Sequence, residues 1–457
     1  MSELKQDLLL RFVKIINVIM ITIPFMINWF AYSVIEIRPQ YYIRTLFLLL
    51  IIFTILYVVL GKVYDCFEIS TQRISELIYS QIITIMFCDF IIGIIILLIS
   101  DQLYNILPMI VMFAEQVLVA VLWAYFAHQW YFRTFPPKVT AIIYQQCNRV
   151  GNLINDYGLS KRYNVKFVIN AHECIQDLTI LSETQVVFLD EIREQDRSRI
   201  LKYCVSKGID VYVMPFAEDV IMCGSTSFPM FHSAMFRVGR YKPSVEYLIV
   251  KRVMDILLSV IGIVLTSPIM LGTAIAIKLT DGGPVFYKQT RLTKDAKEFS
   301  ILKFRSMRVD AEKDGIARLS TGDKDNRVTK VGKIIRKCRI DELPQLFNIL
   351  QGTLTLCGPR PERPEIAEQY CKENPDFALR LQVKAGLTGY AQVYGKYNTS
   401  PKDKLMMDLL YIAHPSIIKD MRLILATIKI LFIPESTEGI SEDQITAAPR
   451  RVSEVGE

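Results

Sequence analysis

Residues 251–279 read KRVMDILLSVIGIVLTSPIMLGTAIAIKL, an apolar run that opens on a basic pair and is interrupted by Ser267-Pro268. A proline inside a helix removes a backbone hydrogen bond and kinks or breaks the helix. Each half of the run is only about 11 residues long, too short to cross a bilayer alone. Two structures are open: a kinked membrane crossing, or a re-entrant hairpin over 254–279 that enters one leaflet and returns.

Four longer apolar segments lie upstream, and each has roughly the length that a helix needs to cross a bilayer. Lysine and arginine lie before the first segment, in the loop between the second and third segments, and after the fourth segment. By the positive-inside rule, both ends of this predicted four-helix transmembrane bundle (1–137) lie in the cytoplasm. One further full crossing would carry a later site outside, so the topology favours the re-entrant hairpin. The four segments are 15–35, 44–61, 79–100 and 103–126.

The composition agrees with a membrane protein. Hydrophobic residues make up 51% of the chain and the mean hydropathy is +0.29. The net charge of +7 lies mostly near apolar segments or near one acidic pair, which indicates attraction to anionic lipid and phosphate and not to nucleic acid. The nine cysteines are scattered without a Cys-x-x-Cys pair, a pattern that favours reduced thiols over disulfides or a metal site.

A small Rossmann-like cytosolic α/β domain is predicted over 138–245, because short β-type runs alternate with polar helical runs there. A dinucleotide-binding turn would carry glycines where Gln146 and Asn148 stand, and only Gly151 remains. A structural or regulatory role is therefore favoured. The predicted strands are Val139–Tyr144, Val165–Asn170, Gln185–Leu189 and Asp210–Met214, with helices over Arg149–Asp156 and Asp196–Lys207.

Three further features carry weaker signals. Asp89 and Glu115 are expected to be buried in the third and fourth membrane helices, where hydrogen bonding inside the bundle is favoured over transport or proton relay. Ser416 to Ile433 is amphipathic, and could either lie on the membrane or cover the catalytic core. The polar segment 434–457 is predicted to be a disordered tail.

The acidic pair Asp341-Glu342 lies between a basic stretch, 330–337, and Gly358-Pro359-Arg360-Pro361. One carboxylate can attack phosphorus while the other holds Mg²⁺. Pro344 fits the first turn of a helix but not its interior, which places the pair near a helix N-terminus, where phosphate is also favoured. Most Asp-Glu pairs are solvated surface residues, so it is the basic neighbourhood that makes this pair a candidate site.

Four basic residues could offset charge that develops on a phosphate. Lys303 and Arg305 flank one inward residue of a predicted strand. Arg360 lies between two prolines, and its restricted backbone can present the guanidinium fork to a phosphate. Arg336 precedes Asp341 by more than one helical turn, so a helix break is predicted between them.

These ordered blocks resemble the catalytic domain of the bacterial sugar transferase family, the monotopic phosphoglycosyl transferases, over residues 246–433. Before residue 246 the chain is similar, more loosely, to the long form of that family, the polyprenyl-phosphate hexose-1-phosphate transferases. The expected fold class is membrane α + α/β. The blocks are Lys251-Arg252…Asp255, Ser267-Pro268, Gly283–Gln289, Lys303–Met307, Asp341–Asn348, Gly358–Pro361, Gly386–Val393 and Asp408…Tyr411.

The resemblance implies a two-step reaction. Asp341 would attack the sugar-bearing phosphorus of a UDP-hexose, such as UDP-glucose or UDP-galactose, and release UMP. Undecaprenyl phosphate would then accept the phosphosugar and become undecaprenyl-diphosphate-hexose. This product would initiate exopolysaccharide, capsule or O-antigen synthesis. Glu342 would bind Mg²⁺, and Ser267 and Pro268 would form the membrane kink. The implied substrate-binding residues are Lys303, Arg305, Arg336, Arg360, Pro361 and Gln392.

The resemblance also implies a location and partners. The chain is expected in the bacterial inner membrane as a multi-pass protein, with the catalytic domain on the cytoplasmic face. Its expected partners are a UDP-sugar, undecaprenyl phosphate, membrane lipid and a second copy of the chain, and no nucleic acid. Departures at Thr293, Leu356-Cys357 and Ala413–Ser416 concern local packing and leave the acidic pair intact.

Overall fold

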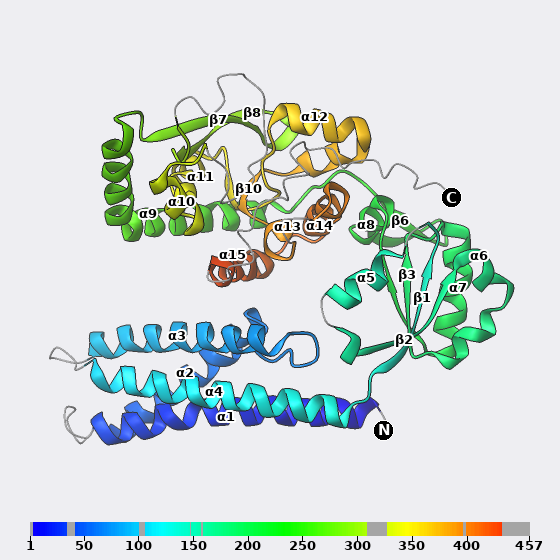
Figure 1. Cartoon of the computed structure of the whole chain (residues 1–457), viewed down its shortest axis with the longest axis horizontal. Coiled ribbons are helices and arrows are strands. Elements are labelled where there is room, and N and C mark those ends of the chain that lie inside the picture. Colours follow the sequence, from blue (N-terminus) through cyan, green and yellow to red (C-terminus); the bar gives the residue numbers. More distant parts are fainter. Residues whose placement is uncertain are drawn as a thin grey trace. The chain divides into compact units, whose positions relative to one another are not determined.

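The computed structural model describes residues 3–33, 42–99, 106–146, 148–156, 159–308, 327–395 and 399–431. These residues divide into two compact units after Met214. The first unit holds four long helices and a parallel sheet (Figure 1), and the second includes the acidic pair. The predicted tail over 434–457 lies outside the described residues.

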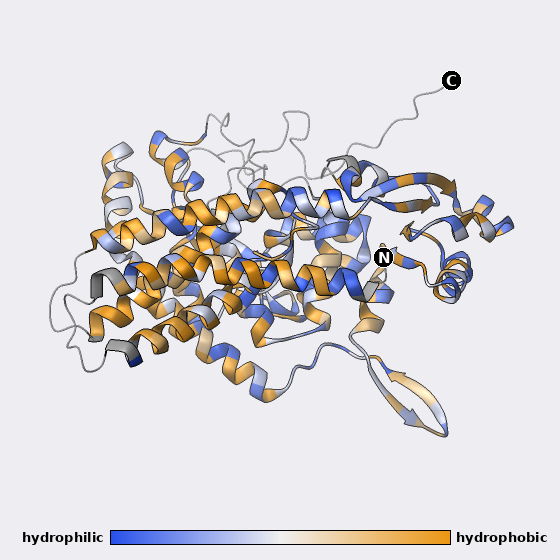
Figure 2. Cartoon of the chain, turned by 90° about the horizontal axis from the view of Figure 1, so that it is seen from below, coloured by the Kyte–Doolittle hydropathy of each residue, from blue (hydrophilic) through white to orange (hydrophobic). Residues whose placement is uncertain are grey.

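Four long helices, which correspond to the four predicted apolar segments, begin the first unit. Each helix packs against its neighbour in the chain, and α1 also packs against α4. All four are long and apolar enough to span a membrane, and Figure 2 shows hydrophobic residues along them. The chain is therefore a membrane protein. The helices are α1 (Glu3–Ser33), α2 (Tyr42–Val63), α3 (Ile74–Ile99) and α4 (Leu107–Thr134).

The two carboxylates of these helices have different surroundings. Asp89 on α3 is buried, and neither carboxylate oxygen has a hydrogen-bond partner in the described part of the chain. Glu115 on α4 is exposed, so its predicted burial is wrong. Its Oε2 accepts a hydrogen bond of 2.7 Å from Nδ2 of Asn28 on α1, so the predicted hydrogen bond between helices is present for this residue.

A four-stranded parallel sheet follows, in the order β2-β1-β3-β4. The central strand β1 buries Ala141, Ile142 and Ile143 completely, as expected for a strand covered on both faces. The four predicted strands are confirmed and differ only at their ends. The strands are β1 (Lys138–Tyr144), β2 (Tyr163–Asn170), β3 (Val186–Asp190) and β4 (Asp210–Val213), with α5 (Arg149–Asp156), α6 (Ala171–Gln176) and α7 (Glu194–Lys207) between them.

The N-terminus of α5 is where a dinucleotide fold would bind pyrophosphate. In this chain Oδ2 of Asp190, from the end of β3, accepts hydrogen bonds from the backbone amides of Arg149 (2.7 Å) and Val150 (3.0 Å). A carboxylate of the chain itself therefore satisfies the helix terminus. This arrangement explains why the turn carries none of the glycines that a bound phosphate would require at Gln146 and Asn148.

The second unit forms around the short parallel pair β9 (Thr355–Cys357) and β10 (Gly386–Thr388). Its core combines Leu346 and Ile349 of α11 with Leu356 of β9 and Leu405 of α14. The unit also contains α8 (Ala217–Cys223), which packs against α14, although the sequence groups this stretch with the α/β domain. The other elements are β5 (Thr226–Met230), β6 (Ser233–Arg237), β7 (Phe286–Leu292), β8 (Glu298–Phe304), α10 (Lys330–Lys337), α11 (Gln345–Gln351), α12 (Pro364–Glu373), α13 (Tyr390–Val393), α14 (Pro401–Ala413) and α15 (Ile417–Leu431).

The apolar run around Pro268 forms one long helix, α9 (Val245–Asp281), which bends sharply in Figure 1. Pro268 lies inside the helix, and the hydroxyls of Thr266 and Ser267 bond to carbonyls one turn back, an arrangement that bends helices. The run is therefore one continuous, bent helix, and its re-entrant passage into one leaflet stays a prediction. Val264 and Leu265, beside the bend, are largely exposed, as expected for lipid-facing residues.

The helix α15 covers the core of this unit. Asp420 and Leu423 are buried, and the helix packs against α13, β9 and β10. On the opposite face of α15, Ile418 is 81% exposed. Of the two alternatives for the amphipathic segment, covering the core is the one that these contacts support.

Arg252 and Asp255, from the first block of the resemblance, fasten α9 to the core. Arg252 donates two hydrogen bonds of 2.7 Å to the carbonyls of Ile349 and Leu350, at the C-terminal end of α11. The Ile349 carbonyl also accepts a hydrogen bond of 3.0 Å from the amide of Gly352, the residue that caps α11. A cation at the C-terminal end of a helix also interacts favourably with the helix dipole. Asp255 is buried and accepts from Thr355 Oγ1 (2.7 Å) and the backbone amide of Leu356 (3.1 Å).

Replacing Asp255 by alanine should destabilise the second unit. The substitution leaves the Thr355 hydroxyl and the Leu356 amide buried without an acceptor, at a cost of about 2–3 kcal/mol. We expect a fall of several degrees in the unfolding temperature of the detergent-purified protein. Glu373→Ala, at an exposed position of α12, is the control and should leave the temperature nearly unchanged. Equal temperatures for the two variants would contradict this account of α9.

Candidate active site

The acidic pair lies on a short turn between two helices. Asp341 and Glu342 end the turn η5 (Ile340–Glu342), which follows α10 and precedes α11. Arg339 opens the turn with a φ of 54°, in the left-handed region that a non-glycine residue adopts only at a cost of roughly 1 kcal/mol or more. The helix break predicted between Arg336 and Asp341 is confirmed.

The second part of α9 packs against this turn. Met270 and Ile277 of α9 share an apolar cluster with Phe304 of β8, and Ile340 and Leu343, which flank the acidic pair, pack against it. The helix with the exposed apolar surface and the two carboxylates therefore belong to one packed structure. A reaction at this turn would take place beside the part of the unit that is suited to lipid.

Three cations surround Glu342. Its Oε1 is 3.0 Å from Nζ of Lys303, 3.1 Å from Nη2 of Arg360 and 4.0 Å from Nη1 of Arg339. Burial favours the neutral acid, but the combined positive charge outweighs it and holds the pKa of Glu342 well below its usual range. Glu342 is therefore ionised across the physiological pH range, and it joins β8, the turn and the loop after β9.

Asp341 has a different environment. Its Oδ1 is buried and has no hydrogen-bond partner in the described part of the chain. Burial, reinforced by the negative charge of Glu342, raises the pKa of Asp341 to about 6, although Lys303 and Arg336 oppose the shift. Two neighbouring carboxyl groups with separated pKa values are typical of sites that assign them different tasks.

The predicted substrate-binding residues do not all meet at the acidic pair. Lys303 and Arg360 contact Glu342, and Arg336 lies near enough to influence Asp341. Arg305 is buried and packs against Gly283, where an added Cβ would lie 2.1 Å from its Nη1. This close approach gives a physical reason for glycine in the Gly283–Gln289 block.

The last two predicted substrate-binding residues are Pro361 and Gln392. The carbonyl of Pro361 accepts a hydrogen bond of 3.0 Å from Nη1 of Arg291. Nε2 of Gln392, on α13, is buried without a hydrogen-bond partner among the residues that the structure describes. An unpaired buried donor is a candidate for binding a ligand acceptor.

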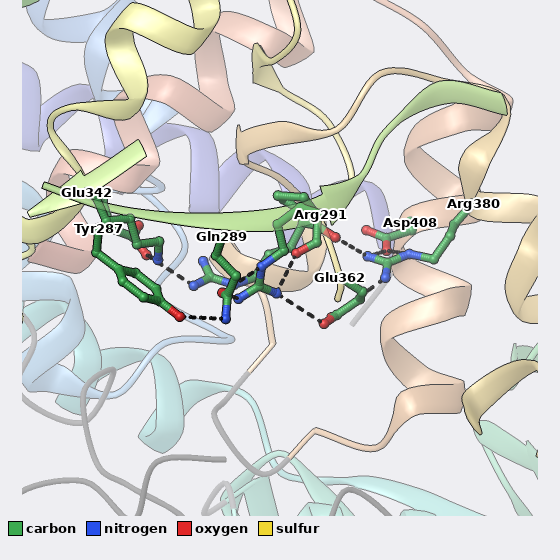
Figure 3. A network of polar contacts seen from close by, with 10 residues as sticks. Tyr287, Gln289, Arg291, Glu342, Glu362, Arg380 and Asp408 are labelled. Carbon is green, nitrogen blue, oxygen red and sulfur yellow. Dashed lines mark hydrogen bonds and ion pairs between the residues drawn. The ribbon is translucent and has the colours of Figure 1, made fainter. Parts of the chain in front are cut away.

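A polar network, which the sequence did not predict, runs beside the site (Figure 3). Arg291 lies between Gln289 and Glu362, and Arg380 lies between Glu362 and Asp408. The alternate positions 289 and 291 share one face of β7, which is the sequence signal that was available. Arg380 and Asp408 come from separate segments, and no local pattern connects them.

The two carboxylates fit a magnesium site that is completed by substrate. Mg²⁺ is usually held by one or two carboxylates together with substrate phosphates and water. The three ion pairs of Glu342 converge on Oε1, and within the described residues the buried Oδ1 of Asp341 has no hydrogen-bond partner. No group of three or more His, Cys, Asp or Glu side chains suited to a metal occurs in that part of the chain.

Comparison with known proteins relates the second unit to sugar-phosphate transferases. Residues 246–434 match the family model described as bacterial sugar transferase. The chain is 39% identical over 246 residues to the UDP-N-acetylgalactosamine-undecaprenyl-phosphate N-acetylgalactosaminephosphotransferase of Aeromonas hydrophila, covering 52% of this chain and 57% of that protein.

Several relatives are named for glucose, including proteins of Caulobacter vibrioides and Escherichia coli K12. Both are UDP-glucose:undecaprenyl-phosphate glucose-1-phosphate transferases. The protein of Caulobacter vibrioides is 37% identical over 205 residues, covering 44% of this chain and 76% of that protein. The protein of Escherichia coli K12 is 36% identical over 212 residues, covering 45% of this chain and 44% of that protein. The matches thus span about half of the Aeromonas and Escherichia proteins but three quarters of the Caulobacter protein.

Neutralising Glu342 should destabilise the protein more than neutralising a surface glutamate. Glu342→Gln leaves Lys303 and Arg360 without their carboxylate, and losing one partner of a buried ion pair costs about 3 kcal/mol. Glu368→Gln removes an exposed i,i+4 pair with Lys372 and should leave the unfolding temperature nearly unchanged. Thermal unfolding of the two purified variants measures the difference. Similar small shifts for both would show that the Glu342 cluster contributes little to stability.

Proposed function

The chain belongs to the bacterial sugar transferase family and is an enzyme of the transferase class, and from this premise we propose that it transfers a hexose-1-phosphate from a UDP-hexose to undecaprenyl phosphate. The observation that carries the proposal is the pair of unequal carboxylates at Asp341 and Glu342, set among cations and packed against α9. A carboxylate that could attack phosphorus, cations that could bind phosphate and a helix with exposed apolar residues occur together there.

In the first step Asp341 would act as the nucleophile. A carboxylate oxygen forms a bond to the sugar-bearing phosphorus, the bond from that phosphorus to the bridging oxygen breaks, and UMP leaves with the electron pair. A pKa of about 6 leaves Asp341 mostly ionised at pH 7, so the nucleophile is available. Its unpaired Oδ1 loses no protein hydrogen bond when it attacks.

In the second step an oxygen of undecaprenyl phosphate would attack the same phosphorus and displace Asp341. The product is undecaprenyl-diphosphate-hexose, and the free carboxylate is regenerated. Lys303, Arg336 and Arg360 would offset the negative charge on the phosphate oxygens in both steps. Glu342 would hold Mg²⁺, which supplies further positive charge at the phosphates when bound.

The membrane topology and the sugar are also part of the proposal. The helix α9 would enter one leaflet of the inner membrane and return, so that the acidic pair lies on the cytoplasmic face. The cytosolic UDP-hexose and the lipid-embedded undecaprenyl phosphate could then meet at one site. The hexose is glucose or galactose by the original resemblance, but one relative is named for N-acetylgalactosamine, so N-acetylated sugars belong in the test. The product would initiate the synthesis of a polysaccharide such as a capsule. That the chain forms a homodimer stays a prediction.

The purified protein in nanodiscs should release UMP from one or a few UDP-sugars when undecaprenyl phosphate and Mg²⁺ are present. The panel should contain UDP-glucose, UDP-galactose and their N-acetylated forms. Asp341→Asn should lower turnover by roughly 10³-fold or more because the nucleophile is lost. Without acceptor, the wild-type protein should release about one UMP per active site and carry a phosphosugar on the peptide that contains Asp341.

Asp376→Asn, at an exposed position, is the matched control and should retain wild-type turnover. Chelation of Mg²⁺ should stop UMP release, and added Mg²⁺ should restore it. Undiminished turnover by Asp341→Asn would exclude the assigned nucleophile. Folded protein that is silent with every donor would exclude the proposed reaction.

The first step should depend on pH with an apparent pKa near 6. Protonated Asp341 is not a nucleophile, so kcat/KM should rise as the pH passes upward through about 6 and level off above 7. The quantity to measure is the rate of the UMP burst as a function of pH. The acceptor is left out because its own phosphate titrates in the same pH range. A flat profile between pH 5 and 8 would contradict the assignment.

A further inference from the structure

We propose that Arg291 and Arg380 are positioning residues for Arg360: each holds a backbone carbonyl of the loop that carries Arg360, and together they set where its guanidinium meets the phosphate. We call Arg291, Arg380 and the carboxylate between them, Glu362, the carbonyl clamp. The inference rests on the proposed function, because that function gives Arg360 its phosphate.

Arg380 makes the first half of the clamp. It is only 4% exposed, and its Nη2 donates a hydrogen bond of 2.9 Å to the carbonyl of Arg360. Its Nε and Nη2 lie 2.9 Å and 2.6 Å from Oδ2 of Asp408 on α14, and its Nη1 lies 3.7 Å from Oε1 of Glu362. All three guanidinium nitrogens are therefore oriented, which a flexible ammonium could not reproduce.

Arg291 makes the second half, one residue further along the loop. Its Nη1 donates to the carbonyl of Pro361 at 3.0 Å and lies 3.8 Å from Oε2 of Glu362. Its Nε and Nη2 donate to Oε1 of Gln289 at 3.1 Å and 2.7 Å. The two carbonyls held by the clamp belong to consecutive residues, and Glu362 interacts with both arginines.

The loop has little other freedom. The amide of Gly358 donates to the carbonyl of Thr388 at 2.8 Å, and a Cβ at Gly358 would lie 2.5 Å from the carbonyl oxygen of Lys384. Pro359 and Pro361 each restrict φ. With both carbonyls held, the remaining freedom is in the Arg360 side chain, which reaches Glu342 at 3.1 Å.

The clamp serves more than stability. A buried Arg–Asp pair is weak evidence for a stabilising role, since apolar residues of similar volume often stabilise as well. The hydrogen bond from Arg380 to the carbonyl of Arg360 is not needed for such a pair. It couples Asp408 of α14 to a residue of the phosphate site, and small displacements of a catalytic cation can cost about 10²-fold in rate.

The test is a double-mutant cycle on the first step of the reaction. Arg380→Lys keeps the charge but cannot reach Asp408, Glu362 and the carbonyl of Arg360 at once. We expect about a tenfold loss in kcat, with KM changed less than about threefold. In an Arg360→Gln background, Arg380→Lys should change kcat by less than about twofold, because the residue through which it acts is absent. Arg291→Lys should behave in the same way.

Equal losses in the presence and absence of the Arg360 guanidinium would overturn the inference and leave the proposed function intact. Hydrogen exchange of peptides from 357–363 and 289–293 provides a readout without turnover. The amide of Leu292 donates to the carbonyl of Glu362, so loosening the loop should speed exchange in both peptides. Arg237→Lys, at an exposed position of β6, is the control and should change neither exchange nor turnover.

The two proposals can fail separately. A wild-type protein that releases no UMP would exclude the function, and exchange would then decide the clamp by itself. Unchanged exchange in both Arg380→Lys and Arg291→Lys would overturn the clamp whatever the turnover. Faster exchange in 357–363 together with the non-additive kcat is the expected result.

Discussion

The buried carboxylate of Glu342, with the cations that converge on it, is the interaction on which the site depends. Lys303 comes from β8, Arg339 from the start of the turn, and Arg360 from the loop after β9. A single ionised side chain therefore holds three separate segments together. An isolated charge could not be buried there, because removing a carboxylate from water costs several kcal/mol without compensation.

The same cluster separates the behaviour of two adjacent acids. Glu342 is at the centre of the positive charge and stays ionised, whereas Asp341 is buried beside a neighbour that is already negative, which raises its pKa to about 6. Sequence adjacency thus creates the difference, because one carboxylate takes the cations and the other experiences the repulsion. A phosphate that enters would meet partly neutralised cations and a carboxylate without a protein partner.

Local patterns predicted the elements whose structure is decided locally. The short β-type run Val139–Tyr144 predicted the central strand, and the spacing from Arg336 to Asp341 predicted the helix break. The interactions of Arg380 with Asp408 and with the carbonyl of Arg360 depend on tertiary packing and leave no periodic trace. The proline left two structures of this run open, and the structure shows a continuous helix that bends there, with the hydroxyls of Thr266 and Ser267 bonded to carbonyls one turn back.

The two units differ in which polar groups they leave free to interact with a phosphate. In the first unit Asp190 satisfies the N-terminus of α5, so the position at which an α/β fold usually binds phosphate is already occupied by a side chain of the chain itself. In the second unit, Asp341 retains a buried oxygen without a protein partner, beside cations and an apolar helix. The groups that phosphate transfer requires therefore occur together only in the second unit, as far as the described residues extend.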